Sequence, residues 1–152
     1  MDFFLVRHGE AKPEYEDPKR PLSDRGRRDV ERMARALSEK RVPVAAIVHS
    51  GKLRARQTAE IMARILSPGR RVRTITGLAP EDDPALAKAE LEAADAPVML
   101  VGHLPHLGRL AALLVTGDAE RNVVEFPSAA VVCLSRGERG WTVAWSLAPD
   151  ML

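Results

Sequence analysis

The sequence has little cysteine and few aromatic residues. Cys133 is its only cysteine, so the chain can form neither an intramolecular disulfide nor a cluster of thiolate metal ligands. This residue lies in the apolar run from Ala129 to Leu134, where we expect a buried structural thiol. Aromatic residues make up only 4% of the chain. The sequence therefore lacks the interleaved stacking residues that binders of single-stranded nucleic acid use.

Neither sign of charge dominates the chain. Its 23 lysines and arginines stand against 21 acidic residues, which gives a formal net charge of +2. No long stretch carries a run of like charge, so the composition does not favour a nucleic acid as partner. We expect a solvated surface of mixed charge instead.

Long hydrophobic runs are missing as well. The only apolar stretch before Arg7 is Phe3–Val6, far shorter than the core of a signal peptide or a membrane-spanning helix. We therefore expect no membrane partner and a cytoplasmic location. A length of 152 residues, 45% of them hydrophobic, suits one compact domain, residues 1–152. We expect this domain to be a monomer or a weak homo-oligomer.

Short apolar runs alternate with amphipathic segments along the chain. The predicted strands are Phe3–Val6, Val44–Val48, Val72–Ile75, Val98–Val101, Ala129–Leu134 and Thr142–Ser146. The predicted helices are Asp24–Lys40 capped by Ser23, Lys52–Leu66 capped by Ser50, Asp83–Ala94, and one that starts near Pro105 and carries Leu107, Leu110, Ala111 and Leu114; Pro68 and Gly69 interrupt the chain after the second helix. This order predicts an α/β fold, a three-layer α/β/α sandwich around a mostly parallel sheet, mixed if the last two strands form a hairpin. Trp141 and Trp145 are expected to pack into the core from one face of the last strand.

Polar residues follow the predicted strands at their carboxyl ends. Arg7, His8 and Gly9 leave the first strand together, and His103 leaves the strand Val98–Val101 just before a helix. A neutral imidazole can attack phosphorus, and a guanidinium can bind two phosphoryl oxygens at once. Because functional loops gather at the carboxyl ends of strands, we expect both histidines to face one phosphate-binding crevice.

A second group of polar residues is spaced by four. Ser50, Arg54 and Thr58 therefore share one face of the predicted helix Lys52–Leu66, and Arg54 lies in its first turn. A helix start favours anions. Alone, these residues are as typical of a plain helix cap and an exposed arginine as of a binding site.

Together, these motifs resemble those of the histidine phosphatase superfamily. The tetrad Arg7–Glu10, the Ser50, Arg54 and Thr58 element, and Gly102 with His103 occur in the order of that superfamily. The SixA-type phosphohistidine phosphatases are the most similar branch, through the segments Arg20–Ser23, Leu53–Ala55, Gln57–Thr58 and Gly102–Pro105. The resemblance covers about Asp2 to Val132.

The resemblance implies a phosphoglycerate mutase-like fold and a specific division of roles. His8 would be the nucleophile, with Arg7, Arg54 and His103 clamping the phosphate and Gly9, Ser50 and Thr58 adding to the phosphate site. It implies no metal and no cofactor. The expected partner is a phosphohistidine-bearing protein, such as a phosphotransfer or phosphorelay domain. His8 has to be neutral to attack, whereas His103 would serve best when protonated.

Two alternatives remain open at this stage. A small-molecule phosphomonoester phosphatase would need a general acid, for which Glu81 and Asp82 are the candidates, whereas a departing imidazole needs an acid less. A module that binds phosphorylated partners without turnover is disfavoured by the two histidines and two arginines. We leave His49 and His106 outside the catalytic set, expecting a strand-end residue and a rim or solvent-facing residue respectively.

Overall fold

The structure, a computed structural model, describes residues 1–66 and 71–152. The predicted break at Pro68 and Gly69 lies outside the described residues. The strands are β1 (Asp2–Arg7), β2 (Ala46–His49), β3 (Arg71–Thr74), β4 (Val98–Gly102), β5 (Val131–Gly137) and β6 (Gly140–Leu147). The helices are α1 (Asp24–Glu39), α2 (Leu53–Leu66), α3 (Pro84–Ala93) and α4 (His106–Thr116), followed by a 3-10 turn, η1 (Pro149–Met151).

One sheet contains these strands in the order β3-β2-β4-β1-β5-β6. The pairs β3-β2, β2-β4 and β4-β1 are parallel, while β5 runs antiparallel to both β1 and β6. The last two strands therefore form a hairpin on the edge of a parallel sheet. This confirms the predicted α/β fold with a mostly parallel, mixed sheet.

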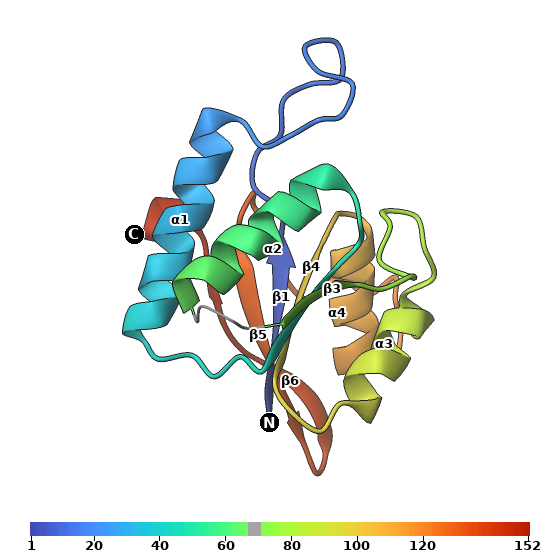
Figure 1. The fold of residues 1–152 in the computed structure, drawn as a ribbon. Coiled ribbons are helices and arrows are strands. Elements are labelled where there is room, and N and C mark those ends of the chain that lie inside the picture. Colours follow the sequence, from blue (N-terminus) through green and yellow to red (C-terminus); the bar gives the residue numbers. More distant parts are fainter. Residues whose placement is uncertain (67–70) are drawn as a thin grey trace.

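Helices cover both faces of the sheet (Figure 1). On one face, Phe4 and Val6 of β1 pack with buried residues of α1 and α2. On the other face, Phe3 and Leu5 pack with α3 and α4, because successive residues of a strand point to opposite sides. The result is the predicted three-layer sandwich. Within the described part of the chain, no helix is long and apolar enough to cross a membrane.

A β-bulge corrects the prediction for the two tryptophans. Cys133 pairs with Trp145, but Leu134 pairs with Val143, so β6 contains one extra residue at this point. The extra residue inverts the alternation of side chains. Trp141 consequently packs beside α3 and α4, whereas Trp145 packs against the core under α1 and α2. Cys133 is buried as predicted, and its burial raises the pKa of its thiol to about 12.

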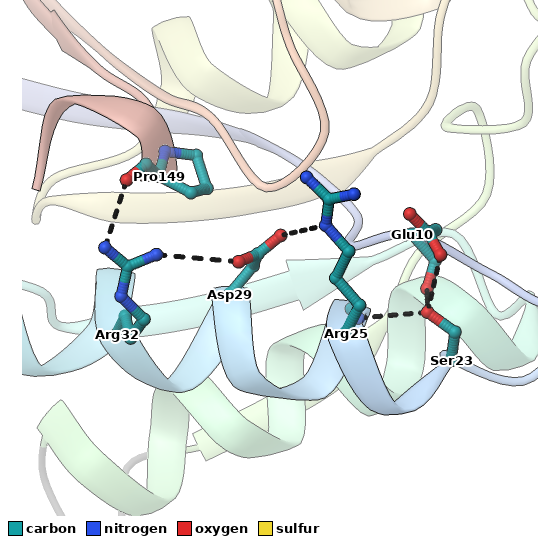
Figure 2. A network of polar contacts seen from close by, with 7 residues as sticks. Glu10, Ser23, Arg25, Asp29, Arg32 and Pro149 are labelled. Atoms are coloured by element: carbon teal, nitrogen blue, oxygen red, sulfur yellow. Dashed lines mark hydrogen bonds and ion pairs between the residues drawn. The ribbon is translucent and has the colours of Figure 1, made fainter.

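The start of α1 is fastened to the segment that follows β1 (Figure 2). The Ser23 hydroxyl accepts a hydrogen bond from the Gly26 N–H at 3.0 Å and donates one to Glu10 Oε1 at 3.0 Å. The Ser23 N–H also donates to the Glu10 carbonyl at 2.9 Å. Further along α1, Arg32 donates to the Pro149 carbonyl at 3.3 Å, which ties the helix to η1.

Two helical glycines have opposite surroundings. A Cβ at Gly26 of α1 would overlap the carbonyl oxygen of Glu10, so only glycine permits this close approach. A Cβ at Gly108 of α4 would meet nothing within 4 Å. Close packing thus explains the first glycine and leaves the second unexplained by the fold.

We expect Gly26→Ala and Gly108→Ala to change stability in opposite directions. Gly26→Ala should lower the free energy of unfolding by about 1–3 kcal/mol through overpacking. Gly108→Ala should raise it by about 0.4–1 kcal/mol because the unfolded chain loses freedom. Urea unfolding of both variants measures this. A Gly26→Ala variant as stable as the parent, or a destabilised Gly108→Ala, would contradict the packing described here.

Candidate active site

The ends of β1 and β4 bring His8 and His103 together. The two strands are adjacent and parallel, with Arg7 opposite Gly102. The His8 N–H extends this pairing by donating to the Gly102 carbonyl at 3.1 Å. The two imidazole rings lie with their centroids 5.0 Å apart and their planes 55° apart. The histidines that the sequence placed in one crevice are therefore neighbours.

A hydrogen bond orients the His8 ring. Its Nδ1 lies 2.7 Å from the Gly9 carbonyl oxygen. Since a carbonyl oxygen can only accept, Nδ1 carries the proton in this contact. In the neutral ring Nε2 is then the unprotonated nitrogen, with its lone pair available for attack.

Burial keeps His8 neutral. It lowers the pKa of His8 to about 4, and the positive charges of Arg54, Arg7 and Arg20 act in the same direction, while the hydrogen bond to Gly9 opposes them. Burial also lowers the pKa of His103 to about 3, with His8, Arg54 and Lys52 adding to the effect. Both rings are thus neutral near pH 7. A phosphoryl group between them would act in the opposite sense and raise both pKa values.

Arg7 and Arg54 each have a hydrogen-bond donor without a partner among the described residues. Arg7 Nη1 donates to the Phe126 carbonyl at 2.9 Å, which holds its side chain in place. The Nε atoms of Arg7 and Arg54 are buried and have no hydrogen-bond partner among the described residues. Because burying an unpaired charged donor is costly, such groups are typical of a site that binds an anion.

Arg20 is a further candidate for the site, which the spacing of the polar residues does not single out. Its positive charge contributes to lowering the pKa of both His8 and Arg54, so Arg20 lies near both side chains. Arg20 has a left-handed backbone, with φ of 49°, and its Nε donates to the Lys12 carbonyl at 3.1 Å. Residues with such a strained backbone are often found at functional sites. The available signal was its place in the segment Arg20–Ser23 that carried the resemblance to SixA-type phosphatases.

Gly9 and Thr58 join the first strand to α2. The buried Thr58 hydroxyl accepts from the Gly9 N–H at 3.1 Å and donates to the Arg54 carbonyl at 2.9 Å. A Cβ at Gly9 would lie 2.8 Å from Val30 Cγ2 and 2.9 Å from the Gly26 carbonyl oxygen, so a larger residue would force the backbone of α1 to shift. Both residues therefore position His8 and Arg54, and their direct contact with phosphate stays a prediction.

Ser50 lies beside His103. Its Oγ is 2.6 Å from His103 Nε2, and it also accepts from the Lys52 N–H at 3.3 Å. The predicted capping role was wrong, because α2 begins at Leu53 and the Ser50 hydroxyl bonds no N–H within it. Its hydroxyl instead orients the imidazole of His103, which is almost fully buried.

The two remaining histidines are both buried. His49 is buried, and its Nδ1 accepts from the Gly51 N–H at 3.1 Å, as suits a strand-end residue. His106 is 0% exposed, so the prediction of a rim or solvent-facing residue was wrong: it is the first residue of α4 and points inward. Burial lowers the pKa of His106, and the nearby Asp82 carboxylate opposes this.

The acidic candidates do not act on His8. Glu81 is exposed, and Asp82 Oδ2 accepts from the Ala79 N–H at 2.9 Å. Arginines, and no carboxylate, are the charged groups that shift the pKa of His8 within the described residues. A general acid role for Glu81 or Asp82 therefore stays a prediction.

Comparison with known proteins identifies relatives along the whole chain. Residues 3–79 match the model of the histidine phosphatase superfamily, branch 1. The phosphohistidine phosphatase SixA of Escherichia coli is 30% identical over 98% of this chain and 94% of its own length. An uncharacterised protein of Picosynechococcus is 38% identical over 78% of this chain and 75% of its own. A structure of the protein histidine phosphatase SixA with tungstate superposes with a TM-score of 0.89 at 29% identity, covering 99% of both chains.

We expect Arg20→Asn to separate the function of Arg20 from its backbone strain. Asparagine tolerates a positive φ but removes the guanidinium. Loss of a charged hydrogen bond to an anion should lower kcat/KM for a phosphorylated substrate about 10- to 100-fold. The melting temperature should stay near that of the parent, and the exposed neighbour substitution Lys19→Ala should change neither quantity. Full activity in Arg20→Asn would remove Arg20 from the site.

Proposed function

Because this chain belongs to the histidine phosphatase superfamily and is of its SixA type, we propose that it hydrolyses phosphohistidine on a protein substrate through a phosphoryl intermediate on His8. That it is a phosphatase follows from the family. The nucleophile, the clamp and the substrate class are the parts that the geometry supports and experiments have to test.

The observation that carries the proposal is an arginine cluster without acidic partners around a neutral imidazole. Arg7, Arg20 and Arg54 all lower the pKa of His8. Within residues 1–66 and 71–152, none of the three forms an ion pair with a carboxylate. Such a concentration of positive charge calls for an anionic ligand. The free Nε2 of His8 supplies a nucleophile at the same place.

In the first step, His8 Nε2 attacks phosphorus in line with the leaving nitrogen. The new N–P bond forms as the N–P bond of the substrate breaks, and the electron pair of that bond stays on the departing imidazole. Arg7, Arg54 and His103 stabilise charge on the equatorial oxygens. His103 takes up a proton from the solvent as the phosphoryl group approaches, because that group raises its pKa.

In the second step, water attacks the phosphoryl group on His8. The bond from Nε2 to phosphorus breaks, inorganic phosphate leaves, and neutral His8 is restored. The hydrogen bond from Nδ1 to the Gly9 carbonyl at 2.7 Å persists throughout and keeps the attacking nitrogen the same in each cycle.

The surroundings of His8 favour a phosphoramidate over an ester. An alkoxide leaving group needs a proton from a nearby acid, whereas an imidazole can leave with a proton already on its other nitrogen. Glu81 is exposed and Asp82 is bonded to its own loop. The name of the E. coli relative, a phosphohistidine phosphatase, agrees with this substrate. The tungstate in the SixA structure is a tetrahedral oxyanion, like phosphate.

We expect phosphate release from a phosphohistidine-bearing protein and much slower release from phosphoserine or sugar phosphates. The parent and His8→Ala are compared on each substrate by measuring inorganic phosphate. His8→Ala should lose at least about 10³-fold in rate, since no other nucleophile lies at its position. Glu81→Gln and Asp82→Asn serve as matched variants and should retain phosphohistidine turnover.

Each alternative has a distinct outcome. Turnover of esters alone, abolished in Glu81→Gln or Asp82→Asn, would replace our substrate with a small phosphomonoester. Tight binding of phosphohistidine without phosphate release would identify a binding module. Full activity of His8→Ala would overturn the mechanism.

A further inference from the structure

A groove of about 340 Å³ lies beside the active site, between α4 and the segment 119–126. One wall consists of Leu104, Pro105 and Gly108, and the facing wall includes Val124 and Phe126. Apolar and polar residues both line it, and no step of the proposed mechanism uses it. We call it the α4 groove.

The α4 groove is continuous with the active site. Leu104 and Pro105 directly follow His103 in the chain. On the opposite wall, the carbonyl of Phe126 accepts the hydrogen bond from Arg7 Nη1 at 2.9 Å. The two walls therefore extend from two residues that clamp the phosphoryl group. A chain that presents a phosphohistidine to His8 would carry its neighbouring residues into this groove.

Gly108 leaves the wall of the groove open. It is the third residue of α4 and lies in the first turn of the helix. Its absent Cβ would meet nothing within 4 Å, so packing inside the protein does not require glycine here. A glycine that has no packing reason and lines a groove suits the close approach of another chain.

The edges of the groove are polar. Arg109 and Glu120 form an ion pair at 3.4 Å, and Asn122 donates to Glu125 at 2.9 Å; Glu120, Asn122 and Glu125 are exposed. Leu104 keeps 37% of its surface exposed next to this rim. Apolar residues bordered by exposed polar ones are typical of a protein interface.

We propose that the α4 groove docks the phosphohistidine-bearing protein, and that an apolar side chain beside the phosphohistidine packs on Leu104 over Gly108. This inference rests on the proposed function and adds the surface that recognises the polypeptide. Affinity for the protein then comes from the groove, while the phosphoryl group is held by the arginines and His103.

The test places a larger side chain in the groove. It then compares two substrates in which the same N–P bond of phosphohistidine is broken. Gly108→Gln places an uncharged side chain on the wall at a helical position with open space above it. Ser38→Gln, on exposed surface of α1, is the matched control. Each variant and the parent are assayed on a phosphohistidine-bearing protein and on free phosphohistidine.

For Gly108→Gln we expect kcat/KM toward the protein substrate to fall about tenfold or more, mostly through KM. Turnover of free phosphohistidine should stay within about twofold of the parent. Leu104→Ser, which removes the apolar contact without adding bulk, should show the same selectivity. Ser38→Gln should change neither substrate.

Equal losses on both substrates, or no loss on either, would overturn the docking surface while leaving the proposed function intact. If Gly108→Gln changed the oligomeric state in solution without changing the hydrolysis rate of the protein substrate, the groove would be assigned to a second copy of this chain instead. If the parent hydrolyses neither substrate, the proposed function itself fails, and the docking proposal fails with it.

Discussion

The parallel pairing of β1 with β4 is the constraint on which the rest of the site depends. It sets Arg7 opposite Gly102, and the hydrogen bond from the His8 N–H to the Gly102 carbonyl extends it by one residue. Both strands are buried on both faces, so a shift of one residue would turn every side chain toward the wrong core. The two hydrophobic cores thereby fix the separation of His8 and His103.

Several features around His8 and His103 do not stabilise the fold. Arg7 and Arg54 have buried Nε atoms without partners among the described residues, and Arg20 holds a strained backbone. Backbone carbonyls, not carboxylates, orient these groups: Phe126 holds Arg7 and Lys12 holds Arg20. Because carbonyls orient a guanidinium without neutralising it, the positive charge stays available for an anion.

The sequence predicted most of the fold and the centre of the site for a common reason. Buried strands and amphipathic helices follow local patterns, and strand ends meet at one edge of the sheet, so His8, Arg54 and His103 could be grouped in advance. The sequence did not predict features that depend on tertiary contacts. The bulge that separates Trp141 from Trp145 depends on pairing with β5, and the burial of His106 depends on packing of α4. Arg20 lies near His8 because of the path of a loop, which no periodicity describes.

The central claim is that the hydrogen bond between His8 Nδ1 and Gly9 reserves Nε2 for attack. Rapid alkaline quenching of the protein during turnover of a phosphohistidine-bearing substrate, followed by tandem mass spectrometry and phosphorus NMR, locates the phosphoryl group directly. We predict a single acid-labile phosphoryl group on Nε2 of His8, absent from His8→Ala. A phosphoryl group on Nδ1 of His8 or on His103, or steady turnover with unmodified His8 throughout, would contradict the account.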